Sequence, residues 1–208
     1  MNPRITIGKT PCIDKTAHVG HTTLRSFKDR TLVIGDNATI RSNAVIYEGT
    51  KIGSGLETGH NVVIREENRI GKNFSLWNNS TVDYGCTIGN NVKIHCNCYI
   101  AQFTVIEDDV FMAPGVTIAN DLHPGCSYSK KCMHGPTIEK GVQIGVNVTI
   151  LPFVRIGKYS LIGSGSVVAK DVPPYSVVYG NPAQVKKNIY ELKCQKGHVK
   201  MPYPKGKK

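Results

Sequence analysis

The sequence predicts an all-β protein, a parallel β-helix built from hexapeptide repeats, and three observations lead to that fold class. An aliphatic residue returns at every sixth position in 23 of 24 hexads, with Thr58 as the exception. A period of six fits neither the helical period of about 3.6 nor the strand period of about 2, but it is typical of β-helix coils. Glycine also follows many of these positions. Three hexads would therefore close one triangular coil.

The phase of the repeat sorts the aliphatic residues into three columns that face one core. The columns begin as Ile34, Ile52, Ile70; as Ile40, Thr58, Leu76; and as Ile46, Ile64, Val82. Continued from Ile7 to Val168, the count predicts about eight three-hexad coils, each hydrogen-bonded to the next. Residues 1–180 are therefore predicted to form one β-helix domain.

Two insertions interrupt the count, at residues 23–31 and at residues 120–135. Both fall between a third-column hexad and the next first-column hexad, so both loops are expected to leave the same edge of the prism. Binding and catalytic residues concentrate in loops on rigid scaffolds. That edge, and above all the large loop 120–135, is the predicted functional region.

After Val168 the repeat stops, and a short C-terminal helix is predicted over residues 181–193. Asn181 is a good N-cap and Pro182 a good first helical residue. Residues 194–208 combine lysines with glycine and proline, which predicts a flexible basic tail.

The formal net charge of +11 favours anionic partners such as nucleotides, phosphates, nucleic acid or acidic membrane surfaces. No stretch approaches the roughly 18 apolar residues of a membrane span, and the N-terminus lacks the apolar core of a signal peptide. We therefore expect a cytoplasmic protein without membrane insertion. The seven cysteines are an odd number, and most of them are interpreted as buried free thiols.

Four segments at the end of the repeat carry a family resemblance: IGVNVTI at 144–150, IGSGSVV at 162–168, DVPP at 171–174 and GNPA at 180–183. They resemble the acyl-CoA end of the left-handed β-helix, or hexapeptide-repeat, acyltransferases. The left-handed twist of the helix is taken from this resemblance, because the general rule for parallel crossovers favours the opposite hand.

The segments VKIHCN at 92–97 and EDDVFMAPGV at 107–116, leading into Asn120, resemble one branch of that family. This branch N-acetylates nucleotide-linked amino sugars, as in the UDP-2-acetamido-3-amino-2,3-dideoxy-glucuronate N-acetyltransferases, for surface glycan (polysaccharide) biosynthesis. The resemblance implies a homotrimer in which acetyl-CoA and the amino sugar meet between neighbouring prisms. It implies no metal requirement, and we expect no nucleic-acid partner.

His123, at the start of the large loop, is the predicted catalytic base. A histidine at the corresponding position serves that role in the hydroxyl-acetylating members that the sequence resembles. An imidazole suits the task because its pKa lies near 7, so a neutral form can accept the proton. A loop polar residue beside Pro124 is the alternative interpretation.

His60, Asn78, Asn97 and Asn120 are the predicted substrate-binding residues. His60 stands in the hexad with the polar anchor, and a local violation of a strong pattern often marks function. Asn78 occupies the same position one coil later, although an internal asparagine ladder would explain it equally. Asn97 matches the asparagine of the amino-sugar branch.

The resemblance places the coenzyme along the last coils. Gly145, Gly163 and Ala169 would leave room for the pantetheine, and the amide of Gly145 would stabilise the thioester oxyanion. Lys170 and Lys186 would meet the phosphates.

The large loop also gathers Cys126, Cys132 and His134. We predict free thiols there, with a zinc site as the alternative, because the spacing matches none of the common zinc patterns.

Three other functions compete with N-acetylation. O-acetylation of a sugar or small-molecule hydroxyl would use the same His123. A γ-type carbonic anhydrase would need a pair of histidines five residues apart, yet Ile100 stands five residues after His95. A non-catalytic β-helix would need neither the large histidine-bearing loop nor the coenzyme-like end.

Overall fold

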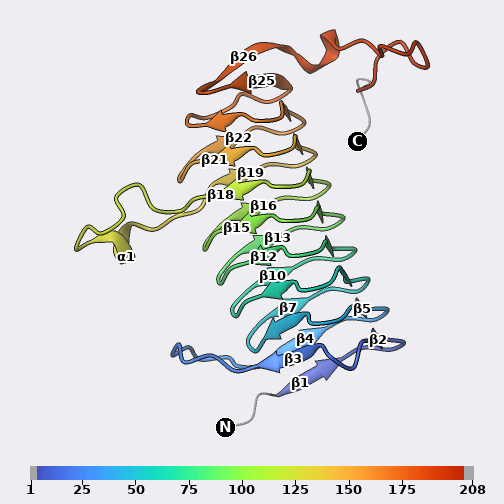
Figure 1. Cartoon of the computed structure of the whole chain (residues 1–208), viewed down its shortest axis with the longest axis vertical. Helices are drawn as coiled ribbons and strands as arrows, with labels where there is room; N and C mark the ends of the chain where they lie inside the picture. The colour runs from blue at the N-terminus through green and yellow to red at the C-terminus, as the bar shows by residue number, and fades with distance from the viewer. Residues whose placement is uncertain (1–3, 204–208) are drawn as a thin grey trace.

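The computed structural model describes residues 4–203 and shows a left-handed parallel β-helix (Figure 1). Three parallel sheets form the faces of a triangular prism, and eight strands of each sheet stack one per coil. The predicted all-β fold of about eight coils is confirmed.

The strands of each sheet follow the chain upward in order. The first sheet contains β1 (Ile5–Ile7), β4 (Leu32–Ile34), β7 (Lys51–Ile52), β10 (Arg69–Ile70), β13 (Thr87–Ile88), β16 (Val105–Ile106), β19 (Thr137–Ile138) and β22 (Arg155–Ile156). The second contains β2 (Cys12–Ile13), β5 (Thr39–Ile40), β8 (Glu57–Thr58), β11 (Ser75–Leu76), β14 (Lys93–Ile94), β17 (Phe111–Met112), β20 (Gln143–Ile144), β23 (Leu161–Ile162), β25 (Ser176–Gly180) and β26 (Ala183–Asn188). The third contains β3 (His18–His21), β6 (Val45–Tyr47), β9 (Val63–Ile64), β12 (Thr81–Val82), β15 (Tyr99–Ile100), β18 (Thr117–Ile118), β21 (Thr149–Ile150) and β24 (Val167–Val168).

The register of the sheets places each anchor over its equivalent in the next coil. Ile70 pairs with Ile52 on one side and Ile88 on the other, at the one-coil spacing of 18 residues. The columns continue across the large loop, where Ile106 pairs with Ile138. From β4 onward these anchors are buried and form one continuous core, because every column points inward.

Thr58, the polar anchor, has a structural explanation. Its side chain is fully buried, and its hydroxyl accepts a hydrogen bond from the Arg41 amide at 2.9 Å. Because the backbone amide of Arg41 bonds to this hydroxyl, the Thr58 carbonyl is free to accept a hydrogen bond from the Arg41 guanidinium. The hydroxyl therefore joins two coils.

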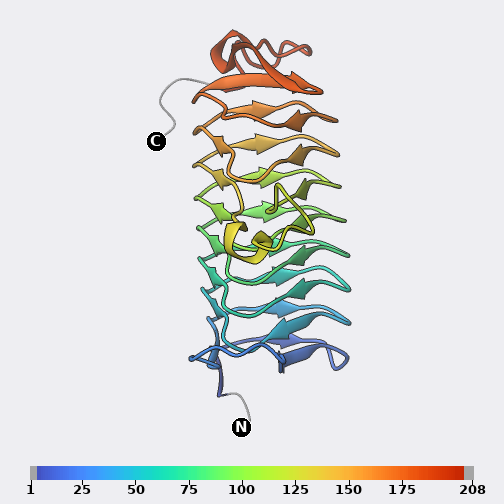
Figure 2. The ribbon, with the colours of Figure 1, turned by 90° about the vertical axis from the view of Figure 1, so that its left-hand side faces the viewer.

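Two edges of the prism differ in the loops and turns that they carry. The loop edge joins the third sheet to the first and has its turns at residues 47–50, 65–68, 83–86, 101–104, 119–136 and 151–154. The asparagine edge joins the second sheet to the third and has its turns at residues 41–44, 59–62, 77–80, 95–98, 113–116, 145–148 and 163–166. Both predicted loops project from the loop edge, as Figures 1 and 2 show, so that prediction is confirmed. They span residues 22–31 and 119–136, and the larger one contains α1 (Ser129–Cys132).

The predicted helix at 181–193 is wrong. Strand β25 pairs with β23 and would leave a free edge, which β26 covers by antiparallel pairing. Asn181 and Pro182 form the turn between them, because an Asn-Pro pair signals a tight turn as well as a helix start. A short 3-10 helix, η1 (Ile189–Glu191), follows, and its capping residue is Asn188.

Residues 194–203 contain neither helix nor strand. The last residues of the predicted basic tail, 204–208, lie outside the described residues, and its flexibility stays a prediction. Within residues 4–203, no helix has the length and apolar character needed to cross a membrane.

Candidate functional site

His123 is exposed to solvent on the large loop, and hydrogen bonds order the loop around it. The carboxylate of Asp121 accepts hydrogen bonds from the His123 amide, at 2.9 Å, and from the Ser129 hydroxyl. Ser129 and His123 together lower the pKa of Asp121, with the Ser129 bond the larger cause. The amide of His134 donates to the Asn120 carbonyl at 2.9 Å and closes the loop. His123 is therefore an exposed imidazole on a loop with both ends anchored.

The weak zinc candidate is not supported. Among residues 4–203, no three His, Cys, Asp or Glu side chains gather closely enough to hold a metal ion. Cys126 and Cys132 are exposed free thiols. His134 instead stacks on Phe153, with ring centroids 5.4 Å apart, and so fixes the end of the loop.

The structure brings His60, Asn78 and Asn97 together on the asparagine edge. The Asn78 side chain accepts a hydrogen bond from the His60 amide at 2.9 Å, and the Asn97 amide donates to the Asn78 carbonyl at 3.0 Å. The His60 ring lies 2.6 Å from the Ser42 hydroxyl. These three residues occupy a different edge from His123, whereas the fourth predicted substrate-binding residue, Asn120, lies in the loop of His123. One chain therefore does not unite the predicted base with the whole predicted set.

Aromatic residues lie beside this set. His95 packs between Trp77 and Phe111, with ring centroids 6.4 and 5.4 Å away. Burial, and then the neighbouring Lys93 charge, lowers the pKa of His95. The imidazole of His95 is therefore predominantly neutral near pH 7.

The predicted coenzyme-binding residues fall into three places. Gly145 and Gly163 stack on the asparagine edge, Ala169 and Lys170 follow β24, and Lys186 lies exposed on β26. A Cβ on Gly145 would come within 2.6 Å of the Ser164 amide, so the next coil already occupies that space. The predicted oxyanion role of Gly145 is wrong, because its amide donates to the Ile162 carbonyl at 2.8 Å.

The loop edge holds a buried acidic network that the sequence interpretation missed. Glu48 and Glu66 are fully buried at equivalent positions of consecutive coils. Arg30, from the loop 22–31, pairs with Glu48. Arg25, from the same loop, and Arg65 each lie 3.0 Å from Glu66. Burial alone would raise the pKa of Glu66, but its own backbone amide and the two arginines lower it overall.

The network continues to the base of the large loop. Asp83 pairs with Arg65 at 3.1 Å and accepts hydrogen bonds from Tyr99 and Gln102. Gln102 in turn accepts a hydrogen bond from the Asn120 side chain at 2.5 Å. Burial, and then the bond to Asp83, raises the pKa of Tyr99 to about 12. One chain of contacts therefore links the two loops.

A sequence signal for this network exists. Glu48 and Glu66 are 18 residues apart, which is the one-coil spacing, and arginines stand in the shorter loop. Acidic residues at that spacing stack in space, so they require counter-charges nearby.

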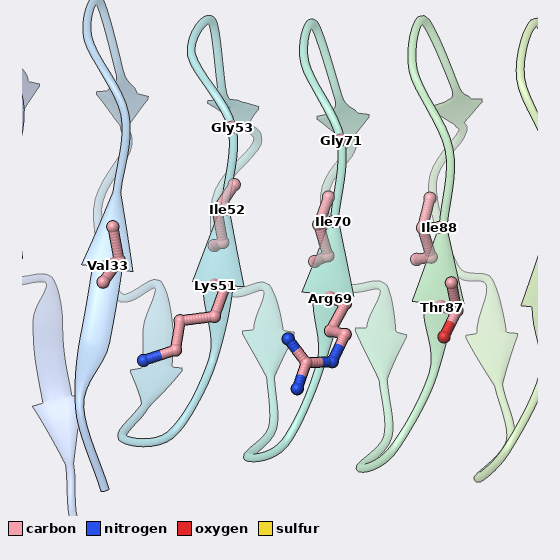
Figure 3. Close-up of a pocket in the computed structure, with 9 residues that line it drawn as sticks. All are labelled: Val33, Lys51, Ile52, Gly53, Arg69, Ile70, Gly71, Thr87 and Ile88. Atoms are coloured by element: carbon pink, nitrogen blue, oxygen red, sulfur yellow. The ribbon is translucent and has the colours of Figure 1, made fainter. Parts of the chain in front are cut away.

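A shallow hollow of about 400 Å³ lies on the first sheet between β4 and β13 (Figure 3). Lys51 and Arg69 project from its floor, which includes Gly53 and Gly71. Lys51 pairs with Asp29 at 2.9 Å, whereas the Arg69 guanidinium has no hydrogen bond or ion pair within residues 4–203. The hollow thus offers one free positive charge.

The known family described as "Bacterial transferase hexapeptide (six repeats)" matches residues 31–66, 69–102, 85–120 and 135–170, which is more than half of the chain. The chain belongs to this hexapeptide-repeat transferase family. Both edges lie within the matched segments, except for residues 22–30, 67–68 and 121–134 of the loop edge.

Two relatives of this hexapeptide-repeat protein show how far the likeness extends. It is 40% identical to the galactoside O-acetyltransferase of Lactococcus lactis over 118 residues, which cover 49% of this chain and 55% of the relative. It is 32% identical to the bifunctional protein GlmU of Thermotoga maritima over 164 residues, which cover 79% of this chain and 31% of the relative.

The solved structure of LpxA, a UDP-N-acetylglucosamine acyltransferase from Bacteroides fragilis, shares the fold. The TM-score is 0.73 and the sequence identity 24%, over 90% of this chain and 73% of that chain. This hexapeptide-repeat protein and LpxA are therefore alike in architecture.

Proposed function

We propose that the protein transfers an acetyl group from acetyl-CoA to the amine of a nucleotide-linked amino sugar used in surface glycan synthesis. The observation that carries the proposal is the exposed His123 on an anchored loop of a hexapeptide-repeat prism. The charge of +11 suits a site for two nucleotide-type polyanions.

In the proposed reaction, the amine attacks the thioester carbonyl of acetyl-CoA. His123 takes the proton that the amine loses, and the C–S bond breaks to give the amide and the CoA thiolate. The imidazolium of His123 then returns the proton to that thiolate. No covalent intermediate on the protein is needed, and positioning supplies much of the rate.

The proposed site lies between copies of the chain in a homotrimer. His123 projects from the loop edge, whereas His60 and Asn97 stand on the asparagine edge. One prism cannot bring the two sets together. A neighbouring prism that turns its asparagine edge toward this loop would unite them.

The coenzyme is proposed to run along the last coils. Lys170 and Lys186 are exposed there, and cationic side chains suit its phosphates. Ala169 has a small exposed side chain beside Lys170 and leaves room for the pantetheine. No resident metal takes part in this scheme.

O-acetylation of a sugar hydroxyl is the second candidate. It is supported by the 40% identity to a galactoside O-acetyltransferase over 118 residues. The two candidates differ in the nucleophile, so the product distinguishes them. An amide survives mild alkaline hydroxylamine, whereas an O-acetyl ester does not.

The test is CoA release from acetyl-CoA, measured with a thiol reagent against UDP- and dTDP-linked amino sugars and their hydroxyl analogues. We expect turnover with an amino sugar and a hydroxylamine-resistant product. Turnover only with hydroxyl acceptors would replace the first candidate by the second. No CoA release with any acceptor in either set would contradict both.

Mixed oligomers test the shared site. His123→Ala and Asn97→Gly chains are each expected to be nearly inactive, and glycine keeps the left-handed turn at Asn97 (φ 59°). Co-refolded mixtures should regain activity, because some interfaces pair two intact edges. Failure to regain activity in confirmed mixed trimers would contradict a site that is shared between neighbouring chains.

A further inference from the structure

The loop edge between the two projecting loops forms a surface whose chemistry the proposed reaction does not use. This inter-loop surface lies on the turns that follow β9, β12 and β15, and Figure 1 shows these coils between the shorter loop and the large one. Its members are Arg25, Arg65, Tyr84, Tyr99, Gln102 and Phe103.

Aromatic rings and guanidinium groups alternate along the inter-loop surface. The Arg25 guanidinium lies 3.5 Å from the centre of the Tyr84 ring, and that of Arg65 lies 5.3 Å from it. Phe103 meets Tyr84 edge to face at 5.5 Å. Tyr99 and Phe103 remain 38% and 37% exposed. Planar apolar groups are thus presented to solvent from a rigid base.

Phe103 is held in an unfavourable backbone conformation. Its φ is 62°, in the left-handed region where asparagine and glycine are preferred. Glycine fills the equivalent turn position one coil earlier, at Gly85, and asparagine fills the left-handed position on the asparagine edge, as at Asn79 and Asn97. A bulky residue in this conformation is strained, and such strain gathers at ligand sites. The Phe103 ring lies against Gly85, so the chain leaves space for it.

The charges of the inter-loop surface nearly cancel. Arg25 and Arg65 face three carboxylates, those of Glu66, Glu67 and Asp83, with N–O distances of 3.0 to 3.1 Å. Two positive and three negative groups leave a net charge of −1. The arginines are therefore committed to carboxylates, which disfavours a polyphosphate here.

Exposed aromatic faces beside amide and guanidinium donors suit a pyranose ring. The ring's C–H face packs on apolar groups, and its hydroxyls bond to fixed polar groups such as Gln102. The residual negative charge suits a ring that carries a protonated amine. Gln102 also bonds to Asn120, so a ring bound here would lie beside the loop of His123.

We propose that the inter-loop surface binds the sugar ring of the acceptor, with Phe103 and Arg25 as its specificity-determining residues. This inference rests on the proposed function for the identity of the acceptor. The nucleotide moiety of the acceptor lies outside this surface.

Saturation-transfer NMR tests the proposal by binding alone. The wild-type protein is irradiated in the aromatic region with UDP-glucosamine or a dTDP-linked 3-amino-3,6-dideoxyhexose, and UDP and dTDP serve as ring-free controls. We expect the pyranose protons to receive saturation. Phe103→Asn, which fits the left-handed turn, and Arg25→Met should each raise the Kd of the nucleotide sugar at least tenfold but that of the bare nucleotide less than twofold.

Tyr159→Asn is the matched control, because Tyr159 has the same turn conformation (φ 56°) on the third edge of the prism. It should leave both Kd values unchanged, and thermal unfolding checks the fold of each variant. Pyranose protons without saturation, or unchanged Kd values in both Phe103→Asn and Arg25→Met, would overturn the proposal. Equal weakening of bare nucleotide would also overturn it. Sugar binding without any CoA release would leave this site standing and remove the proposed transferase reaction.

Discussion

On the asparagine edge, the turns with left-handed backbone place only asparagine or glycine in that conformation, whereas the loop edge places Glu67, Phe103 and Phe153 there in addition to Gly49 and Gly85. The asparagine-edge residues are Asn43, Asn61, Asn79, Asn97, Gly115, Asn147 and Gly165. Asparagine and glycine adopt this conformation at little cost, while bulky residues do so only under compensation. The residues on the asparagine edge therefore suit the backbone conformation of the turn, whereas the bulky residues on the loop edge are better explained by what their side chains contact.

The two edges are also cross-linked differently. Side-chain amides bond from coil to coil on the asparagine edge, as in Asn43 to Asn61 at 3.1 Å and Asn61 to Asn79 at 3.2 Å. The loop edge instead buries Glu66 and Asp83 under arginines. Uniform ladders stabilise a scaffold, but an irregular charged network can hold loops in place. The loop edge is therefore where the molecule departs from its own repeat.

The largest effect that we expect from a substitution on either edge is the loss of kcat in His123→Ala. His123→Ala should lower kcat by about two orders of magnitude, the usual contribution of a general base. The measurement is CoA release at saturating substrates, with the oligomeric state of each variant compared with that of the wild type by light scattering. Cys132→Ser, in the same loop, is the control and should keep kcat within twofold. Near-normal kcat in His123→Ala would remove it as the base and leave the family assignment intact.

The next effect concerns the buried network. Glu66→Gln should lower the free energy of unfolding by about 2 kcal/mol, because it leaves Arg25 without a buried charged partner and leaves Arg65 with Asp83 alone. Glu67→Gln is the matched control: Glu67 pairs with the same Arg25 but is exposed, so its loss should cost under about 1 kcal/mol. Chemical denaturation measures both. Equal losses in the free energy of unfolding would show that burial does not make Glu66 contribute more to stability than the exposed Glu67.

The same network predicts a dependence of stability on acid. The folded state lowers the pKa of Glu66 below its ordinary value of 4.5. The unfolded chain therefore binds the proton first as pH falls, and the stabilisation present above pH 4.5 is lost as pH falls through the folded-state pKa. The free energy of unfolding should decline below that pH in the wild type and decline less in Glu66→Gln. Parallel curves would place the acid sensitivity in other carboxylates.

The period of six was enough to predict the coils, the three columns and the common edge of both loops. Each of these follows from counting, because side chains 18 residues apart must stack in a three-sided helix, as Ile52, Ile70 and Ile88 do. The same counting placed His60, Asn78 and Asn97 on one edge.

The period of six could not predict contacts that form when a loop folds back onto the coils. Glu66 meets Arg25 across 41 residues, and no local pattern specifies that approach. At the C-terminus, Asn181 and Pro182 carry signals for a helix and for a turn, and only the free edge of β25 decides between them. The environment of Gly145 was also hidden, because the next coil supplies the atoms that crowd it.

The smallest effect is expected on the asparagine edge. Asn79→Ala should lower the free energy of unfolding by about 1 kcal/mol, because alanine is strained in the left-handed turn where Asn79 has a φ of 58°. Asn79→Gly removes the amide ladder but not the conformation, so the difference between the two variants isolates the backbone contribution. Activity should stay within twofold in both, since this turn serves the scaffold. If Asn79→Gly is as unstable as Asn79→Ala, the amide ladder, rather than the backbone, would be the reason for asparagine along that edge.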